Sequence, residues 1–203
     1  MLSMRRSFDA FTAFAALVLL SPLLVLVAFA IVIDSPGNPF YLARRSGQNG
    51  VVFRMWKFRT MVPNASRLGP PITGARDPRI TRLGRLLRRT KLDEMPQFIN
   101  VLTGDMELVG PRPESPEIVA RYTDEQMKVL EAKPGVTGKV QLESGEESDF
   151  IPSTENAEEF YIHHLMDRKL RADIDYLEHR TLGSDMRILM STAVYVLRAV
   201  ARH

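Results

Sequence analysis

The chain has 203 residues, of which 45% are hydrophobic and 25% are charged, and its formal net charge at pH 7 is +3. This composition predicts a folded domain with a hydrophobic core and is too apolar for a disordered chain. The sequence contains no Cys. That absence excludes disulfide bonds, zinc sites with thiolate ligands, iron–sulfur clusters and a Cys nucleophile.

An uncharged and strongly apolar segment extends from Ala10 to Ile33, between Asp9 and Asp34. As one straight helix it would be about 36 Å long, enough to cross a hydrocarbon layer of about 30 Å. Ser21-Pro22 divides the segment into two arms of equal length. Pro disrupts a helix interior because it lacks a backbone donor and clashes with the preceding turn. Each arm alone reaches only about the middle of a bilayer.

The charges on both sides of this segment favour two arms over one spanning helix. Arg5 and Arg6 precede it, Arg44 and Arg45 follow it, and basic flanks tend to remain cytoplasmic. We therefore predict a re-entrant helix–break–helix hairpin, broken at Ser21 and Pro22, that enters and leaves the membrane by one face. The alternatives are a kinked spanning helix, a cleaved signal peptide and a twin-arginine export signal.

A basic block follows the apolar segment. Between Leu42 and Lys91 there are 13 Lys and Arg residues and one acid, Asp77, which gives +12. Because the first 41 residues are neutral, Leu92 to His203 carries 3 − 12 = −9. A basic block beside a membrane segment can bind anionic lipid, a phosphorylated substrate or nucleic acid. No nucleic-acid-binding motif accompanies the charge, so we expect no nucleic-acid partner.

The periodicity within the basic block predicts two elements. Between Val51 and Thr60, aromatic residues alternate with basic ones, as in a half-buried strand. Between Arg76 and Lys91, apolar residues recur at helical spacing and Arg residues lie on another side. This amphipathic basic helix would lie on an anionic membrane surface or pack on the core with a solvated face. Residues from about 155 to 200 are predicted to be helical.

An acidic pair stands where the basic block ends. Asp93 and Glu94 precede Pro96, a residue suited to the first position of a helix. Carboxylates before a helix are favoured in the ionised form by its dipole, and the preceding cations act in the same direction. An ionised Asp beside cations can attack phosphorus, and an adjacent acidic pair can bind Mg²⁺. From spacing alone, an ordinary acidic cap at a helix N-terminus is the favoured interpretation of the pair.

Two segments rich in turn residues follow. In the first, from Gly104 to Glu114, Arg112 stands between two Pro residues, so its backbone loses little entropy when it meets an anion. In the second, from Lys133 to Gly138, the Gly residues permit a close backbone approach to a ligand. Either segment can instead be a rigid connection.

Taken together and in this order, the motifs resemble those of the monotopic phosphoglycosyl transferases, the bacterial sugar transferase family. The resemblance extends from about Phe8 to Ile188. The matching segments are Ser21-Pro22, Asp34–Gly37, Lys57–Met61, Arg82–Arg88, Leu92–Gln97, Asn100–Leu102, Gly104–Met106, Leu108–Pro113 and Lys133–Gly138.

This resemblance, with the patterns above, implies a helix-dominated α+β protein. Residues 1–40 would form the re-entrant membrane segment. Residues 41–203 would form a catalytic domain at the cytoplasmic face of the bacterial inner membrane, with amphipathic membrane-surface helices and a small β element. The implied activity is transfer of a phosphosugar from a UDP-sugar to a polyprenyl phosphate, with Mg²⁺, at the first membrane step of a glycan pathway. Without a large N-terminal membrane bundle, the sequence resembles the minimal form of the family.

The resemblance also implies residue roles. Asp93 would attack the sugar-bearing phosphate and release UMP, and Glu94 would act as a base or position Mg²⁺, which the two carboxylates would bind. The residues implied to hold phosphate are Lys57, Arg59, Arg88 and Arg112. Lys91 departs from the family pattern, in which Ser or Thr stands two residues before the Asp. Membrane lipids are expected partners, and a homo-oligomer is compatible with the sequence. The competing hypotheses are a non-catalytic membrane-surface scaffold and a phosphohydrolase.

Overall fold

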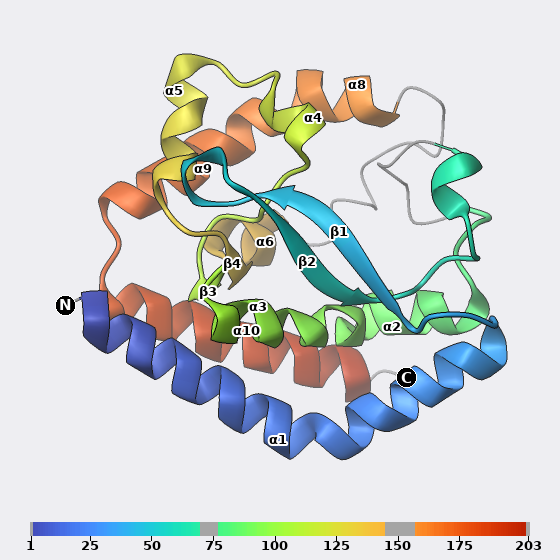
Figure 1. The fold of residues 1–203 in the computed structure, drawn as a ribbon. Helices are drawn as coiled ribbons and strands as arrows, with labels where there is room; N and C mark the ends of the chain where they lie inside the picture. Colours follow the sequence, from blue (N-terminus) through green and yellow to red (C-terminus); the bar gives the residue numbers. More distant parts are fainter. Residues whose placement is uncertain (1, 70–76, 145–156, 202–203) are drawn as a thin grey trace.

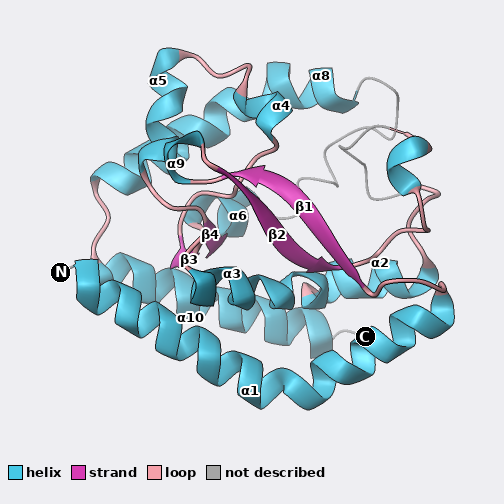
Figure 2. Ribbon diagram, viewed as in Figure 1, coloured by secondary structure: helices cyan, strands magenta, loops and turns pink. Residues whose placement is uncertain are grey.

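The computed structural model describes residues 2–69, 77–144 and 157–201. Within them the chain is a helix-dominated α+β protein with a small amount of β structure, as predicted (Figure 2). A long N-terminal helix lies along one side, a twisted β-hairpin crosses the middle, and shorter helices cover the opposite side (Figure 1). The hairpin therefore lies between the N-terminal helix and this helical layer.

The N-terminal helix, α1 (Leu2–Asp34), is continuous and contains Pro22. The predicted complete break is therefore wrong: the helix bends near its middle instead (Figure 1), as helices do at an interior Pro. Pro22 has no N–H to donate to the carbonyl of Val18, four residues earlier. The Ser21 hydroxyl donates to that same carbonyl at 2.8 Å. Ser21 thus satisfies the acceptor that Pro22 leaves open, and the helix continues.

Both arms of α1 pack on the same body. Ala13 belongs to the main core, whereas Val27 and Ile31 pack with Phe58 and Leu87 in a second cluster. The remaining surface of α1 is apolar and exposed. In the part of the chain that the structure describes, α1 is the one helix long and apolar enough to cross a membrane. Its large exposed apolar residues are Met4, Phe8, Phe11, Phe14, Val18, Leu19, Leu23, Val25, Leu26, Phe29, Val32 and Ile33.

Strands β1 (Phe40–Ser46) and β2 (Val52–Phe58) form the antiparallel hairpin, which confirms the predicted strand. In its register Tyr41 lies opposite Lys57, and Arg45 lies opposite Phe53. Since side chains alternate between the two faces of a strand, Arg45 and Lys57 share one face of the hairpin, and Arg44 lies on the other.

Helix α2 (Arg82–Thr90) is the predicted amphipathic basic helix. It begins later than expected because Thr81 caps it, accepting a hydrogen bond of 2.9 Å from the Gly84 N–H; residue 76 lies outside the described residues. Leu87 is buried and the Arg residues at 82, 85 and 89 are exposed. A Cβ at Gly84 would overlap the carbonyl of Thr60, so Gly84 allows α2 to pack closely on the end of β2.

After Lys91, which adopts the left-handed conformation at φ 59°, the chain forms the 3-10 helix η3 (Leu92–Gln97) and the short helix α3 (Phe98–Thr103). The prediction of one helix starting at Pro96 is therefore corrected. The buried side chain of Asn100 fixes this region on β2. It donates to the carbonyl of Arg54 and accepts from the N–H of Trp56, both at 2.9 Å.

Strands β3 (Glu107–Val109) and β4 (Gly135–Thr137) pair in parallel. A Cβ at Gly135 would overlap the backbone of Gly110. The space beside Gly135 is therefore filled by the chain's own backbone and not by a ligand. This favours the prediction of a rigid connection for this segment. Between and after these strands lie α4 (Pro116–Val119), α5 (Asp124–Met127), a 3-10 turn (Lys128–Glu131) and α6 (Lys139–Ser144).

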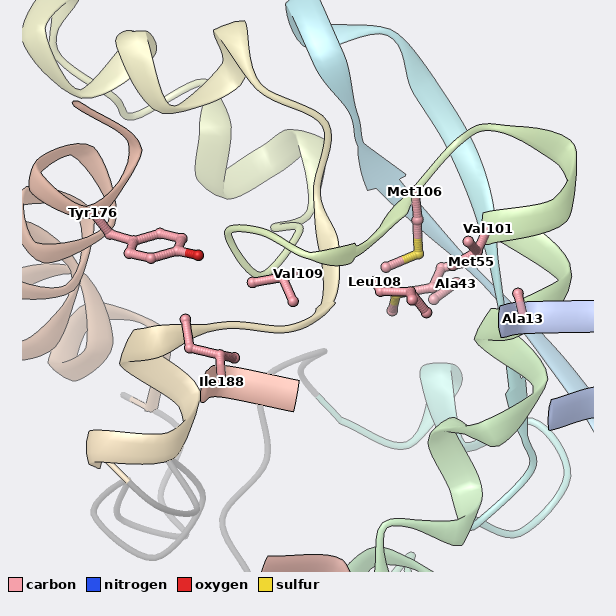
Figure 3. Packing of buried hydrophobic residues seen from close by; sticks show 9 residues of the cluster. All are labelled: Ala13, Ala43, Met55, Val101, Met106, Leu108, Val109, Tyr176 and Ile188. Carbon is pink, nitrogen blue, oxygen red and sulfur yellow. The ribbon is translucent and has the colours of Figure 1, made fainter. Parts of the chain in front are cut away.

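The C-terminal region is helical, as predicted, but interrupted. It comprises α8 (Ala157–Tyr161), a π-helix (Ile162–Met166), α9 (Asp167–Glu178) and α10 (Leu182–Ala201); residue 155 lies outside the described residues. Figure 3 shows the main core, to which elements from both ends of the chain contribute. Its buried residues are Ala13, Ala43, Met55, Val101, Met106, Leu108, Val109, Tyr176 and Ile188.

Candidate active site

The acidic pair lies in η3, and Glu94 is held by cations from two distant segments. Lys57 on β2 places its Nζ 2.9 Å from Oε1 of Glu94. Arg112, in the loop after β3, donates from Nη2 to the same oxygen at 2.8 Å and from Nη1 to Oε2 at 3.4 Å. The structure therefore brings together three of the residues that the sequence singled out.

These contacts determine the ionisation of Glu94. Burial alone would raise the pKa of Glu94, but Arg112 and then Lys57 hold it well below its ordinary value. Burial lowers the pKa of Lys57, and the Glu94 carboxylate opposes that change. Glu94 is therefore a fixed, paired anion at neutral pH, a poor proton acceptor but a firm anchor for two cations.

Asp93, beside it, has a different environment. Its side chain is buried, and its Oδ1 atom has no hydrogen-bond partner within the described residues. Burial, followed by the neighbouring charge of Glu94, raises the pKa of Asp93 to about 6, while Lys57, Lys91 and Arg88 act in the opposite direction. The sequence predicted that a helix dipole and the cations would favour ionisation, but burial outweighs the cations. Asp93 is nevertheless largely ionised at pH 7 and above.

Arg88 is also directed toward this region. Its Nε donates to the Thr60 hydroxyl at 2.9 Å, and its charge acts on Asp93. Arg59 has a different set of partners: it donates to the carbonyls of Ser35 and Pro36 and thereby holds the segment after α1. The structure does not bring Arg59 to the acidic pair, and its proposed phosphate contact stays a prediction.

Several polar residues of the site were not assigned a role from the sequence. Thr60 orients Arg88, and Asn100 joins η3 and α3 to β2. Gln97 is buried, and its Nε2 has no hydrogen-bond partner in the described part of the chain. All three lie inside the motifs that carry the resemblance. The signal was therefore present, but spacing alone does not reveal which side chains point inward.

The donor set at this site fits Mg²⁺ that is also held by substrate phosphates. The described residues contain no cluster of three or more His, Cys, Asp or Glu side chains. Mg²⁺ commonly uses only one or two protein carboxylates and completes its coordination with phosphates and water. The unpartnered Oδ1 of Asp93 is a buried acceptor of this kind, and Oε2 of Glu94 retains acceptor capacity.

A second buried ion pair fixes the loop between β3 and α4, which contains Arg112. Lys169 on α9 places its Nζ 2.8 Å from Oε1 of Glu114 and 3.0 Å from the Tyr161 hydroxyl, which itself donates to Glu114. Although burial opposes it, Lys169 first and Arg45 next lower the pKa of Glu114 to about 2. The Ser46 N–H donates to the Glu114 carbonyl at 2.9 Å, so β1 and α9 both fix the loop.

Residues 1–199 match the bacterial sugar transferase family, and the chain belongs to it. Among its curated relatives is the UDP-glucose:undecaprenyl-phosphate glucose-1-phosphate transferase of Caulobacter vibrioides. The two are 36% identical over 95% of this chain and 69% of the relative. The exopolysaccharide production protein PSS of Rhizobium leguminosarum bv. phaseoli is 33% identical over 95% of this chain and 94% of its own length.

Other relatives are considerably longer than this chain. The undecaprenyl-phosphate galactose phosphotransferase of Salmonella typhimurium is 35% identical over 96% of this chain, which spans only 40% of that protein. The shared part contains the acidic pair, the cations around it and the apolar helix.

Proposed function

We propose that this protein transfers a phosphosugar from a UDP-sugar to a polyprenyl phosphate, releasing UMP. The observation that carries the proposal is Asp93: a buried carboxylate with an unpartnered oxygen, beside cations fixed by Glu94. The names of the relatives add support, because they describe transferases that act on undecaprenyl phosphate.

In the first step, a carboxylate oxygen of Asp93 attacks the sugar-bearing phosphorus of the donor. A new bond joins Asp93 to phosphorus, and the bond from that phosphorus to the bridging oxygen breaks. UMP leaves with the electron pair, and an aspartyl phosphosugar remains. The pKa of Asp93, about 6, supports this role. Burial leaves the carboxylate poorly solvated, and it is nevertheless largely ionised at neutral pH.

In the second step, a phosphate oxygen of the polyprenyl phosphate attacks the same phosphorus. The bond to Asp93 breaks and returns the carboxylate to its starting form, while the sugar leaves on a polyprenyl diphosphate. The ion pairs of Glu94 favour a positioning role over that of a base, because its pKa lies well below its ordinary value. Asp93 and Glu94 would hold Mg²⁺, which when bound supplies charge neutralisation for the phosphates.

The charges around the acidic pair suit an anionic diphosphate. Four cations act on the two carboxylates: Lys57, Arg88, Lys91 and Arg112. The site therefore keeps an excess of positive charge after both carboxylates are paired. Such preformed charge stabilises phosphoryl oxygens in a transition state without reorganisation.

The attachment of α1 supports a re-entrant arrangement at the cytoplasmic face of the inner membrane. Near the start of α1, Arg6 donates to the carbonyls of Val101 and Leu102. At its end, Arg59 holds the carbonyl of Ser35. Both ends are thus fixed to one body by polar contacts, whereas the surface between them is exposed and apolar. A helix that crossed the bilayer would have to release one of these ends.

The decisive experiment measures UMP release from a panel of UDP-sugars, with polyprenyl phosphate as acceptor and the protein in detergent. The relatives differ in sugar, among them glucose, galactose and N-acetylgalactosamine, so the panel should include these. Asp93→Asn should abolish release and Glu94→Gln should reduce it strongly. Glu125→Gln, which changes an exposed acid on α5, serves as the control.

Trapping with labelled donor should add the mass of one phosphosugar at Asp93. Near wild-type turnover by Asp93→Asn would remove Asp93 as nucleophile. Steady turnover without the lipid acceptor would indicate a phosphohydrolase. Binding to anionic vesicles without any magnesium-dependent UMP release would indicate a membrane-surface scaffold.

A further inference from the structure

Arg45 on β1 differs from the other cations near the acidic pair. Lys57 and Arg112 are paired with Glu94, Arg88 is bonded to Thr60, and Lys169 is paired with Glu114. Within the described residues, the side chain of Arg45 has no hydrogen bond or ion pair, and its Nε is buried without a partner. A buried donor without a partner costs free energy, and in native proteins it calls for an explanation.

The register of the hairpin directs Arg45 toward the site. Arg45 shares a face with Lys57, and the buried pair Ala43 and Met55 lies between them on that face. The charge of Arg45 acts on Lys57 and on Glu114, which lies in the same loop as Arg112. Arg45 is therefore located where β1 meets that loop.

The carboxylate of Glu114, on which the charge of Arg45 acts, already has two partners. Glu114 accepts from both Lys169 and Tyr161 through Oε1. The guanidinium of Arg45 thus adds a positive charge to the site without a bonded counter-ion among the described residues. A guanidinium offers five N–H donors in a planar fork that matches phosphate geometry.

We propose that Arg45 binds a phosphate group of a substrate, beyond the cations that the sequence motifs singled out. This proposal rests on the proposed function for the identity of the ligand. The phosphate can come from the diphosphate of the nucleotide sugar or from the lipid phosphate, and kinetic measurements separate the two sources.

The test compares Arg45→Met with Arg44→Met. Arg44 is an exposed neighbour on the opposite face of β1, so both variants remove one positive charge from the same strand. KM for UDP-sugar and KM for polyprenyl phosphate are measured separately in detergent. A rise of about tenfold or more in the donor KM alone assigns the nucleotide diphosphate, and the same rise in the acceptor KM alone assigns the lipid phosphate.

Arg45→Lys should lie between wild type and Arg45→Met, since Lys keeps the charge but not the fork. It also serves as the second variant where Arg45→Met folds poorly, and its KM values then decide in the same way. Two results would overturn the proposal. In the first, both KM values of the Arg45 variants stay within about twofold of wild type; in the second, KM rises equally in the Arg44 and Arg45 variants.

A binding measurement keeps this test separate from that of the overall function. UDP and inorganic pyrophosphate are added to the protein, and the rise in its unfolding temperature is recorded. If Arg45 binds the nucleotide diphosphate, Arg45→Met reduces the rise and Arg44→Met does not. The shift in unfolding temperature can be measured even if the wild-type protein releases no UMP. Absence of UMP release would contradict the proposed function but not the role of Arg45.

Discussion

Lys57 and Glu94 lie 37 positions apart in the sequence, and their side chains meet at 2.9 Å with both largely buried. The ion pair joins strand β2 to the turn that carries Asp93. It therefore couples the fold of the hairpin to the geometry of the acidic pair.

Removing Lys57 should expose this coupling. Lys57→Met leaves Arg112 to hold the buried Glu94 carboxylate without Lys57, so we expect a loss of about 3 kcal/mol in the free energy of unfolding and a severe loss of UMP release. Denaturant unfolding and the UMP assay measure the two effects. Arg54→Met, an exposed cation on the other face of β2, should change neither appreciably. A stable and active Lys57→Met protein would contradict the assigned role of the pair.

The pKa of Asp93 predicts the acid side of the pH–rate profile. Only the ionised carboxylate can attack phosphorus, and the pKa of Asp93 is about 6. The rate of UMP release at low donor concentration should therefore fall by about tenfold per pH unit below that value and level off above it. A profile that remains flat down to pH 4.5 would mean that a different group carries the reaction.

The same pKa predicts that Asp93→Asn stabilises the protein at neutral pH. Because burial raises the pKa of Asp93 above its ordinary value of 3.8, the folded state favours the neutral carboxyl. This contribution to stability is complete below pH 3.8 and is lost as the pH rises through 6. At pH 8 the Asn variant should gain on the order of 1–3 kcal/mol in unfolding free energy, and at pH 4 the gain should vanish. An equal difference in unfolding free energy between the variant and wild type at pH 4 and pH 8 would show that the gain does not come from the raised pKa of Asp93.

The close approach of α2 to the end of β2 depends on the absence of a side chain at Gly84. A Cβ there would overlap the Thr60 carbonyl, whose residue also holds Arg88 through its hydroxyl. Gly84→Ala should destabilise the protein by about 1–3 kcal/mol and lower UMP release by displacing Arg88. Gly183→Ala is the matched control, because Gly183 is an exposed helical glycine with space for a Cβ; it should be neutral or slightly stabilising. Similar melting temperatures for the two variants would refute the close-contact argument.

The topology of α1 can be tested with single Cys variants, since the chain has no Cys of its own. Met4→Cys and Asp34→Cys place exposed thiols near the two ends of α1. In oriented membrane vesicles, a membrane-impermeant maleimide should label both from the cytoplasmic side, as it labels a reference Glu125→Cys on α5. Labelling of the two ends from opposite sides would establish a spanning helix.

The elements that could be predicted from the sequence are those determined by local periodicity. The alternation around Trp56 and the helical spacing of Leu83 and Leu87 predicted β2 and α2, because each pattern depends only on neighbours within a few residues. The acidic pair and the importance of Arg112 were also evident from the motifs.

What the sequence could not reveal depends on contacts between distant segments. The pairing of Lys57 and Arg112 with Glu94, and the burial that raises the pKa of Asp93, follow from packing that no spacing encodes. The break expected at Pro22 became a bend because the preceding Ser21 hydroxyl occupies the carbonyl that Pro22 cannot serve. That compensation involves a side-chain rotamer, which a propensity argument does not consider.

The bonds from Arg6 to the carbonyls of Val101 and Leu102 have a consequence for the proposed arrangement at the membrane. They join the first turns of α1 to α3, which directly follows the turn carrying Asp93. In the proposed re-entrant arrangement, the depth of α1 in the lipid would therefore set the height of Asp93 above the acyl chains. The thickness of a leaflet would then be one of the variables that align the Asp93 carboxylate with the phosphate of the proposed lipid substrate.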